Sequence, residues 1–309
     1  MRSYKRNNYI LLAENFYINE NKEKAIKFYE KALSYEGSKE ETIILLFNIA
    51  IIYEELDRLS DSIEVYNKII ELDSNNYEAY FNMALVEELR HNTEKAIALY
   101  NKAIKLKPNL SKAYYNIATI YDVQGDKNKA LEYFYKVLDH SLDDFITYNN
   151  IGSLYEEMGE YELAYKMIKK SIDINNKFYK SLFNMGVVYK RLGKHKDAIE
   201  YYNKSKECNP NYHYTYLNLS AIYIEDKEYI KSIKILSEGI CNNPEAHDLY
   251  YNRACSYSIL NEVEHAIKDI RKALILNPSL IRWVEKDKDF YNLYDEEEFR
   301  NIIEKNNEY

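Results

Sequence analysis

The chain has 309 residues, of which 46% are hydrophobic and 30% charged, and its 34 tyrosines contrast with only 7 glycines and 4 prolines. So few turn-forming residues argue against an all-β sandwich and against a loop-rich α/β enzyme. With 42 basic and 50 acidic residues the formal charge is -8. This is the wrong sign for binding a phosphate backbone, so no nucleic acid partner is expected.

Near the N-terminus, residues 10–13 form an apolar stretch that is too short for a secretory signal. No run approaches the roughly 18 apolar residues of a membrane span, so no membrane partner is expected. The three cysteines, Cys208, Cys241 and Cys255, form neither a CxxC motif nor an even set, which is typical of a reducing compartment. We therefore expect a cytoplasmic protein.

An internal period of 34 residues organises the chain. The four prolines, at 108, 210, 244 and 278, are separated by 102, 34 and 34 residues, all multiples of 34. The same register aligns small residues at Ala25, Ser62, Ala96, Ala130, Ala164, Ala198, Ser232 and Ala266, with three extra residues between the first two repeats. A second small column lies twelve residues earlier, from Ala13 to Ala254. The repeats start at 6, 43, 77, 111, 145, 179, 213 and 247, and positions below are counted from these starts.

The small residues have a mechanical meaning, because two antiparallel helices approach closely only where one presents Ala, Gly or Ser. Each repeat is therefore predicted to be a helical hairpin. Gly125, Gly159 and Gly193 fall at the turn, where glycine adopts a positive φ at little cost. One hairpin cannot bury its apolar face alone, so we predict an all-α, right-handed solenoid of eight stacked hairpins.

The repeat resembles the tetratricopeptide repeat family, whose W-x2-L-G-x2-Y…A-x3-F…P pattern is matched best by the fifth repeat. There the matching residues are Tyr148, Ile151, Gly152, Tyr155, Gly159 and Ala164. The resemblance covers residues 6–278 and implies a solenoid domain over residues 1–278. Ile69 and Val137 replace usually small residues, and Glu87 replaces an aromatic residue. Because a buried unpaired carboxylate is costly, Glu87 is predicted to reach solvent.

After Pro278 the period is lost, but apolar residues keep helical spacing. They are Leu280, Trp283, Val284, Phe290, Leu293, Phe299, Ile302 and Ile303. We predict that residues 279–309 form a C-terminal cap of one helix and a second short helix, because a terminal repeat needs a polar outer face. Trp283 is the only tryptophan, so its fluorescence is predicted to report docking of the cap.

Motifs that carry catalytic or phosphate-binding chemistry do not occur: the sequence has no GxGxxG, GxxxxGK[ST], HExxH or GxSxG. We therefore do not expect an enzyme or a cofactor. His213 and His247 share the first position of successive repeats, but surface histidines at helix starts are ordinary, and no metal site is predicted. Cys255 is interpreted as a small hydrophobic residue on a helix.

In the first helix of each repeat, positions 2, 5, 6, 9, 12 and 13 lie opposite the core and are predicted to line the inner wall of the solenoid. Position 6 holds a carboxamide in seven successive repeats: Asn48, Asn82, Asn116, Asn150, Asn184, Asn218 and Asn252. Position 5 supplies aromatic residues beside it, namely Phe47, Phe81, Tyr115, Phe183 and Tyr251. A carboxamide offers a donor and an acceptor to a peptide backbone, so we predict a peptide-binding groove.

Charges on this wall change sign along the sequence. Position 12 reads Glu54, Glu88, Asp122 and Glu156 in repeats two to five, whereas repeat six carries Lys180, Lys190 and Arg191. A bound segment is predicted to place basic residues toward repeats two to five and acidic residues toward repeat six. In the tetratricopeptide repeat family, a clamp for chaperone C-termini requires Lys and Arg at positions 2 and 6. Asn116 and Asn184 follow Lys112 and Lys180, so chaperone-tail capture is disfavoured.

These observations predict a non-catalytic scaffold that binds an extended peptide or partner segment through the asparagine ladder. The expected partner is a protein or peptide, and the expected state is a monomer or weak homo-oligomer. Two alternatives stay open. One is a structural solenoid that self-assembles end to end or through its convex face, and the other is a peptide-sensing regulatory receptor.

Overall fold

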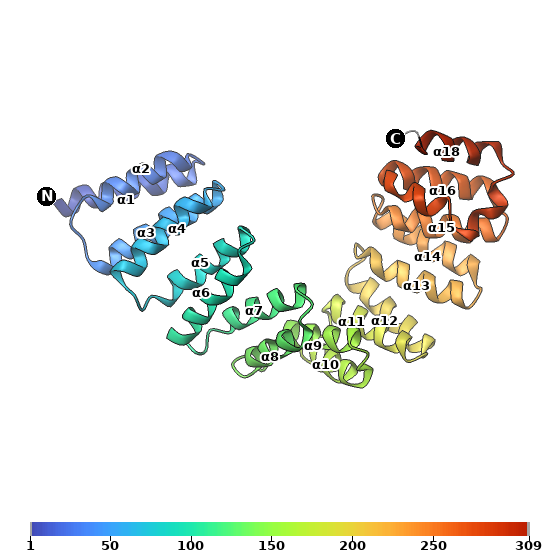
Figure 1. Ribbon diagram of the computed structural model, residues 1–309, viewed down its shortest axis with the longest axis horizontal. Helices are drawn as coiled ribbons and strands as arrows, with labels where there is room; N and C mark the ends of the chain where they lie inside the picture. Colours follow the sequence, from blue (N-terminus) through green and yellow to red (C-terminus); the bar gives the residue numbers. More distant parts are fainter. Residues whose placement is uncertain (1, 308–309) are drawn as a thin grey trace. The chain divides into compact units, whose positions relative to one another are not determined.

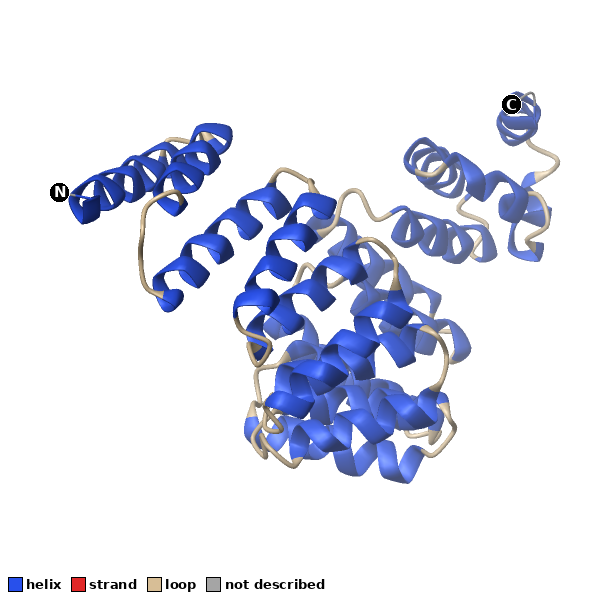
Figure 2. Ribbon diagram, turned by 60° about the vertical axis from the view of Figure 1, so that its left-hand side comes forward, coloured by secondary structure: helices blue, strands red, loops and turns tan. Residues whose placement is uncertain are grey.

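The computed structural model describes residues 2–307, and within that range every regular element is a helix (Figure 2). Eight hairpins follow one another along the chain (Figure 1), each made of a first helix, here called the A helix, and a second, the B helix. The A helices are α1 (Arg2–Ile18), α3 (Lys39–Glu55), α5 (Tyr77–Leu89), α7 (Ser111–Val123), α9 (Phe145–Glu157), α11 (Tyr179–Arg191), α13 (His213–Glu225) and α15 (His247–Ile259). The B helices are α2 (Lys22–Leu33), α4 (Leu59–Leu72), α6 (Thr93–Leu106), α8 (Lys127–Leu138), α10 (Tyr161–Ile174), α12 (His195–Cys208), α14 (Tyr229–Asn242) and α16 (Val263–Leu276).

The hairpins fall into two compact units. The unit Met1–Leu142 contains α1 to α8, and the unit Asp143–Tyr309 contains α9 to α16 and the elements that follow. Six A helices, from α5 onward, begin at the residue where the sequence period places the start of a repeat. The division of the chain into a repeat domain ending at 278 and a cap stays a prediction.

The two helices of each hairpin are joined by one recurring turn. Position 15 has a positive φ in all eight hairpins, including 79° at Gly125, 80° at Gly159 and 70° at Gly193. The next residue donates its backbone N–H to the carbonyl of position 11, as from Asp126 to Tyr121 at 2.9 Å. This is the hydrogen bond of a Schellman motif, which ends the A helix and reverses the chain.

Close packing within a hairpin depends on the small residues. Ala84 and Ala96 in the third hairpin have no exposed surface. In the sixth hairpin, a Cβ atom added at Gly186 would lie 2.6 Å from the ring of Tyr202, closer than two carbon atoms can approach. The large side chain of the B helix therefore occupies the volume that the small residue of the A helix leaves.

Glu87 does not reach solvent, so that prediction was wrong. Its side chain lies in the interior of the third hairpin at 5% exposure. Asn92 donates from Nδ2 to Glu87 Oε2 at 2.6 Å, and Arg90 Nη1 lies 3.4 Å from Oε1. The carboxylate can be buried in place of an aromatic ring because the turn that follows supplies its partners.

The segment after α16 folds as a 3-10 helix η1 (Pro278–Leu280), a short α17 (Ile281–Val284), a second 3-10 helix η2 (Lys288–Leu293) and α18 (Glu297–Asn307). Val284, Phe290, Leu293 and Phe299 pack in one core with Ile270 of the last hairpin. Trp283 is the exception, because 71% of its surface is exposed. We therefore expect its emission to change little when the cap docks, contrary to the prediction from the sequence.

Candidate partner-binding face

The A-helix positions 2, 5, 6, 9, 12 and 13 form a surface that we call the A-face, described separately for each unit. All seven ladder asparagines are half-buried on it. Three, Asn48, Asn82 and Asn116, belong to the unit Met1–Leu142, and the other four to the unit Asp143–Tyr309. Half burial leaves part of each carboxamide exposed to solvent.

In the unit Met1–Leu142 the ladder is tied to tyrosines of the B helices. Asn116 donates from Nδ2 to the hydroxyl of Tyr100 at 2.9 Å, and Asn48 is hydrogen bonded to Tyr29. Asn82 makes no side-chain hydrogen bond to any residue between 2 and 307. Its carboxamide therefore keeps its full bonding capacity for a partner.

In the unit Asp143–Tyr309 the ladder asparagines bond mainly to neighbours on their own face. Asn252 donates to the backbone carbonyl of Asp248 at 2.8 Å, one turn earlier in α15. Asn184 donates at 3.0 Å to Asn149, which replaces the aromatic residue of position 5 and is buried at 4% exposure. Asn150 also contacts Asn149, accepting a hydrogen bond at 3.4 Å.

Asn218 makes two side-chain hydrogen bonds. It donates to the carbonyl of Tyr214 at 3.0 Å and accepts from the hydroxyl of Tyr202 at 3.3 Å. Asn252, by contrast, keeps one N–H and its carbonyl oxygen for further contacts.

The predicted aromatic residues of position 5 are half-buried and pack against aromatic rings behind the A-face. Ring centroids lie 5.9 Å apart for Phe47 and Tyr66, and 5.5 Å apart for each of the pairs Phe81 and Tyr100, Tyr115 and Phe134, and Phe183 and Tyr202. Tyr251 instead packs on Phe290 of the cap at 5.6 Å. These contacts fix the rings, and their exposed edges supply apolar surface beside the carboxamides.

Two of the predicted groove carboxylates accept hydrogen bonds from buried tyrosines. Tyr66 donates to Glu54 at 2.6 Å, and Tyr100 donates to Glu88. Burial raises the pKa of each tyrosine well above its usual range, and the hydrogen bond to the carboxylate raises it further. Each hydrogen bond joins a tyrosine of the B helix to a carboxylate on the A-face of the same hairpin.

Two of the three basic residues of the sixth repeat form ion pairs. Arg191 donates from Nε to Glu156 at 2.8 Å, and Lys190 lies 2.7 Å from Glu225. Lys180 is exposed, as is Asp122 in the other unit. Pairing reduces the contrast in sign that the sequence suggested, because two of the three cations are neutralised by adjacent repeats.

One cluster of potential ligands was not predicted. Cys255, Asp287 and Asp289 bring their ligand atoms within 4.8 Å of one another. Asp287 accepts a hydrogen bond of 2.5 Å from Tyr251, and the thiol of Cys255 lies 3.8 Å from the same oxygen. Burial and the two carboxylates raise the pKa of the Cys255 thiol, so it stays protonated. No sequence signal marks this cluster, because the cap does not follow the 34-residue period.

His213 and His247 contact different partners. His213 Nε2 lies 3.3 Å from Asp248, and His247 Nε2 lies 3.2 Å from Asn277. Neither histidine belongs to a cluster with metal-ligand spacing within residues 2–307.

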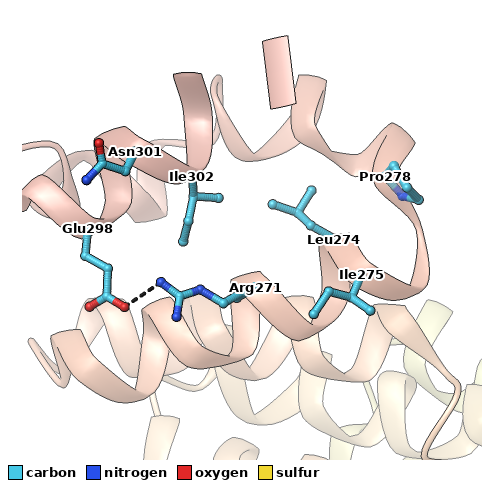
Figure 3. A pocket seen from close by; sticks show the side chains of 7 residues that line it. All are labelled: Arg271, Leu274, Ile275, Pro278, Glu298, Asn301 and Ile302. Carbon is cyan, nitrogen blue, oxygen red and sulfur yellow. Dashed lines mark hydrogen bonds and ion pairs between the residues drawn. The ribbon is translucent and has the colours of Figure 1, made fainter. Parts of the chain in front are cut away.

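A cleft of about 730 Å³ opens between α16 and α18 (Figure 3). Leu274, Ile275 and Ile302 point into it, and an ion pair between Arg271 and Glu298 at 2.5 Å closes one side. Ile275 is 69% exposed. Separately, none of the described helices has the length and apolar character needed to cross a bilayer.

Comparison with known proteins agrees with this architecture. Sequence profiles of the tetratricopeptide repeat match residues 7–38, 44–76 and 247–280, residues 65–98 and 99–132, and residues 143–211. No curated protein matches the sequence significantly.

Among solved structures, a tetratricopeptide repeat protein from Parabacteroides merdae has 17% identity and a TM-score of 0.61, covering 77% of this chain and 94% of that one. The C-terminal part of a TPR repeat-containing protein from Cytophaga hutchinsonii has 19% identity and a TM-score of 0.60, with coverage of 75% and 96%. Pseudomonas aeruginosa pilF has 20% identity and a TM-score of 0.56, with coverage of 72% and 97%. At these identities the likeness concerns the fold alone. The profile matches extend over well more than half of the sequence, and the chain belongs to the tetratricopeptide repeat family.

Proposed function

We propose that this protein is a non-catalytic scaffold that holds an extended segment of a partner protein against its A-face. The observation that carries the proposal is the half-buried carboxamide at the same position of seven successive repeats. Each carboxamide has two N–H donors and an acceptor oxygen, which is the equipment needed to bond a peptide main chain. Membership in a repeat family with an extended surface supports the same interpretation.

Asn82 in the first unit and Asn252 in the second both keep hydrogen-bonding groups for a partner. Asn82 makes no side-chain hydrogen bond within residues 2–307, and Asn252 makes one, to its own helix. The rings of Phe81 and Tyr251 precede them and supply apolar surface for the partner's side chains. Each amide-backbone hydrogen bond contributes about 0.5–1.5 kcal/mol net. Ordering of an extended segment offsets part of this, so we expect dissociation constants on the order of micromolar.

Binding of arrayed random peptides tests the proposal. The double variant Asn82→Ala/Asn252→Ala removes one ladder carboxamide from each unit. A peptide that the wild-type protein retains on either unit should bind this variant about fivefold more weakly, because one main-chain hydrogen bond of about 1 kcal/mol is lost. Asn101→Ala is the matched control, since Asn101 is an exposed asparagine on the B helix α6. Equal affinities of the ladder variant and the control variant would rule out ladder-mediated binding.

Self-assembly is the second candidate, and the cleft between α16 and α18 favours it. Its apolar lining includes the exposed Ile275, which a second copy would cover. Light scattering over a range of protein concentrations separates the two candidates. A particle mass that increases with protein concentration in the absence of peptide, and that no longer increases in Ile275→Asp, supports self-assembly. A mass that does not depend on concentration supports the scaffold proposal.

A further inference from the structure

Exposed apolar side chains gather on the A-face of the unit Met1–Leu142. Six of them, between 42% and 89% exposed, are Leu11, Ile18, Ile44, Ile51, Leu89 and Val123. They come from α1, α3, α5 and α7, and all occupy A-face positions. We call this set the apolar strip. Leu72 and Leu142 are exposed singly elsewhere in this unit, as is ordinary on any protein, but a set of six on one face is a mark of an interaction site.

Two clefts open on the apolar strip. One, of about 130 Å³, is lined by Ile51 together with Tyr17, Tyr29 and Asn48. The other, of about 210 Å³, is lined by Val123, with Glu88 and Thr119 among its other residues. Each cleft gives an anchoring side chain of a partner a place to be buried, as at the centres of protein interfaces.

Acidic groups surround the apolar strip. The A-face positions of these four repeats hold six carboxylates, Glu14, Glu54, Glu55, Glu78, Glu88 and Asp122, and a single basic residue, Lys112. In the unit Asp143–Tyr309 the same positions are nearly balanced, with Glu156, Glu157, Glu225 and Asp248 against Lys180, Lys190 and Arg191. Charge complementarity therefore directs a basic partner to the first unit.

Most polar groups next to the apolar strip are already hydrogen bonded within the chain, and Asn82 is an exception. Tyr17 donates to Glu55 at 2.6 Å, Tyr66 donates to Glu54 at 2.6 Å, and Asn116 donates to Tyr100. An extended segment needs main-chain partners from the surface that binds it, whereas a helix satisfies its own backbone and offers only side chains. An apolar surface with most of its polar groups occupied suits a helix.

We propose that the A-face of the unit Met1–Leu142 binds a cationic amphipathic helix of a partner protein. The apolar stripe of the helix covers the apolar strip, and its flanking lysines and arginines face the surrounding carboxylates. This inference goes beyond the proposed function, because it assigns a helical and not an extended segment to the first unit, and it rests on that function only in using the same face.

The probe is a fluorescein-labelled peptide of leucine and lysine, about 18 residues or five helical turns long, with its leucines at positions i, i+3, i+4 and i+7. One control peptide has the same composition with strictly alternating leucines, which places them on one side of a strand. A second keeps the helical spacing but replaces lysine with glutamate. Fluorescence anisotropy measures binding to the full-length protein at several salt concentrations.

The double variant Ile51→Ser/Leu89→Ser removes two apolar contacts from exposed positions, and Val123→Ser, at the most exposed position, gives an independent variant. Leu72→Ser is the matched control, because Leu72 is 44% exposed at the end of the B helix α4 in the same unit. Circular dichroism verifies that each variant is folded. We expect the helical leucine-lysine peptide to bind at least tenfold more tightly than either control peptide, and the double variant to lose at least tenfold in affinity.

Equal binding of the two leucine-lysine peptides, or an equal loss in Leu72→Ser, would overturn the inference. So would self-association of the wild-type protein that Ile51→Ser/Leu89→Ser abolishes, because the strip would then be a contact between copies. If arrayed extended peptides depend on Asn82 and Asn252 while the helical peptide ignores Ile51 and Leu89, the proposed function stands and this inference fails. If instead the helical peptide depends on Ile51 and Leu89 while extended peptides do not depend on Asn82 and Asn252, ladder-mediated binding fails and the helix-binding inference stands.

Discussion

Arg253 of α15 holds Asp269 of α16 through two parallel hydrogen bonds, from Nε at 2.7 Å and from Nη2 at 2.8 Å. Asp269 is 3% exposed, and Ser237 accepts a third hydrogen bond from the guanidinium at 2.8 Å. The last hairpin is thus joined internally by a buried, bidentate ion pair.

Removing one partner of this pair should be costly. Asp269→Ala leaves a largely buried guanidinium without its carboxylate, and we expect the free energy of unfolding to fall by about 3–5 kcal/mol. Glu264→Ala, an exposed position on the same helix, should change it by less than about 0.5 kcal/mol. Urea denaturation followed by circular dichroism measures both. Similar effects of the two variants would mean that the pair adds nothing.

Alkaline pH should destabilise the unit Met1–Leu142 through its buried tyrosines. The pKa values of Tyr66 and Tyr100 are raised by burial and by their bonds to Glu54 and Glu88. The unfolded tyrosine has a pKa of about 10, so the unfolded state loses its proton first. The stabilisation from each group is complete below about pH 10 and falls above it, by up to about 1.4 kcal/mol per pH unit.

Urea denaturation between about pH 8 and 11 checks this sign against the tyrosine reference pKa of about 10. Tyr66→Phe/Tyr100→Phe should show a shallower loss of stability with pH than the wild-type protein. Tyr291→Phe, at a position that is 57% exposed, should leave the slope unchanged. A steeper slope in the double variant would contradict the assignment.

The three cysteines should differ in reactivity. Cys208 and Cys241 are exposed, whereas Cys255 is buried and its pKa is raised. Because the thiolate is the reactive species, a chromogenic disulfide reagent should react rapidly with two thiols in the native protein and with the third only after unfolding. Cys255→Ser should abolish only the reaction that requires unfolding and leave the two rapid reactions unchanged. Rapid reaction of all three thiols in the native state would show that the cap opens readily.

Trp283 should behave as a solvent-exposed fluorophore in the folded protein, because 71% of its surface is accessible. Acrylamide should quench its emission almost as strongly in the native state as in urea, and the emission maximum should shift little on unfolding. Strong protection from quenching would indicate that another molecule covers this part of the cap.

Much of the fold could be predicted because the sequence repeats. Small residues at fixed spacing determine where two helices can approach, so the A helices from Tyr77 onward begin where the period places them. The same period also explains contacts that were not predicted from the sequence. Residues about 34 apart lie side by side on successive hairpins, as do Glu156 and Arg191, or Lys190 and Glu225 at 2.7 Å.

Other parts of the molecule could not be predicted, for two physical reasons. Glu87 is buried because Asn92 and Arg90 reach back to it from the turn, and single-residue hydrophobicity does not include such partners. The cluster of Cys255, Asp287 and Asp289 joins the last hairpin to a cap that has no period. The partial exposure of the ladder depends on how the A helices are spaced, which the register alone does not give.

The hairpin turns also indicate where this protein could be made more heat-resistant. Five of the eight turns hold a residue other than glycine at a positive φ, namely Glu20 at 60°, Asp57 at 57°, His91 at 60°, Lys227 at 59° and Asn261 at 62°. Side chains with a Cβ disfavour that geometry by about 1–2 kcal/mol, less for Asn and Asp. Changing Glu20, His91 and Lys227 to glycine should raise the melting temperature, because glycine adopts a positive φ at little cost.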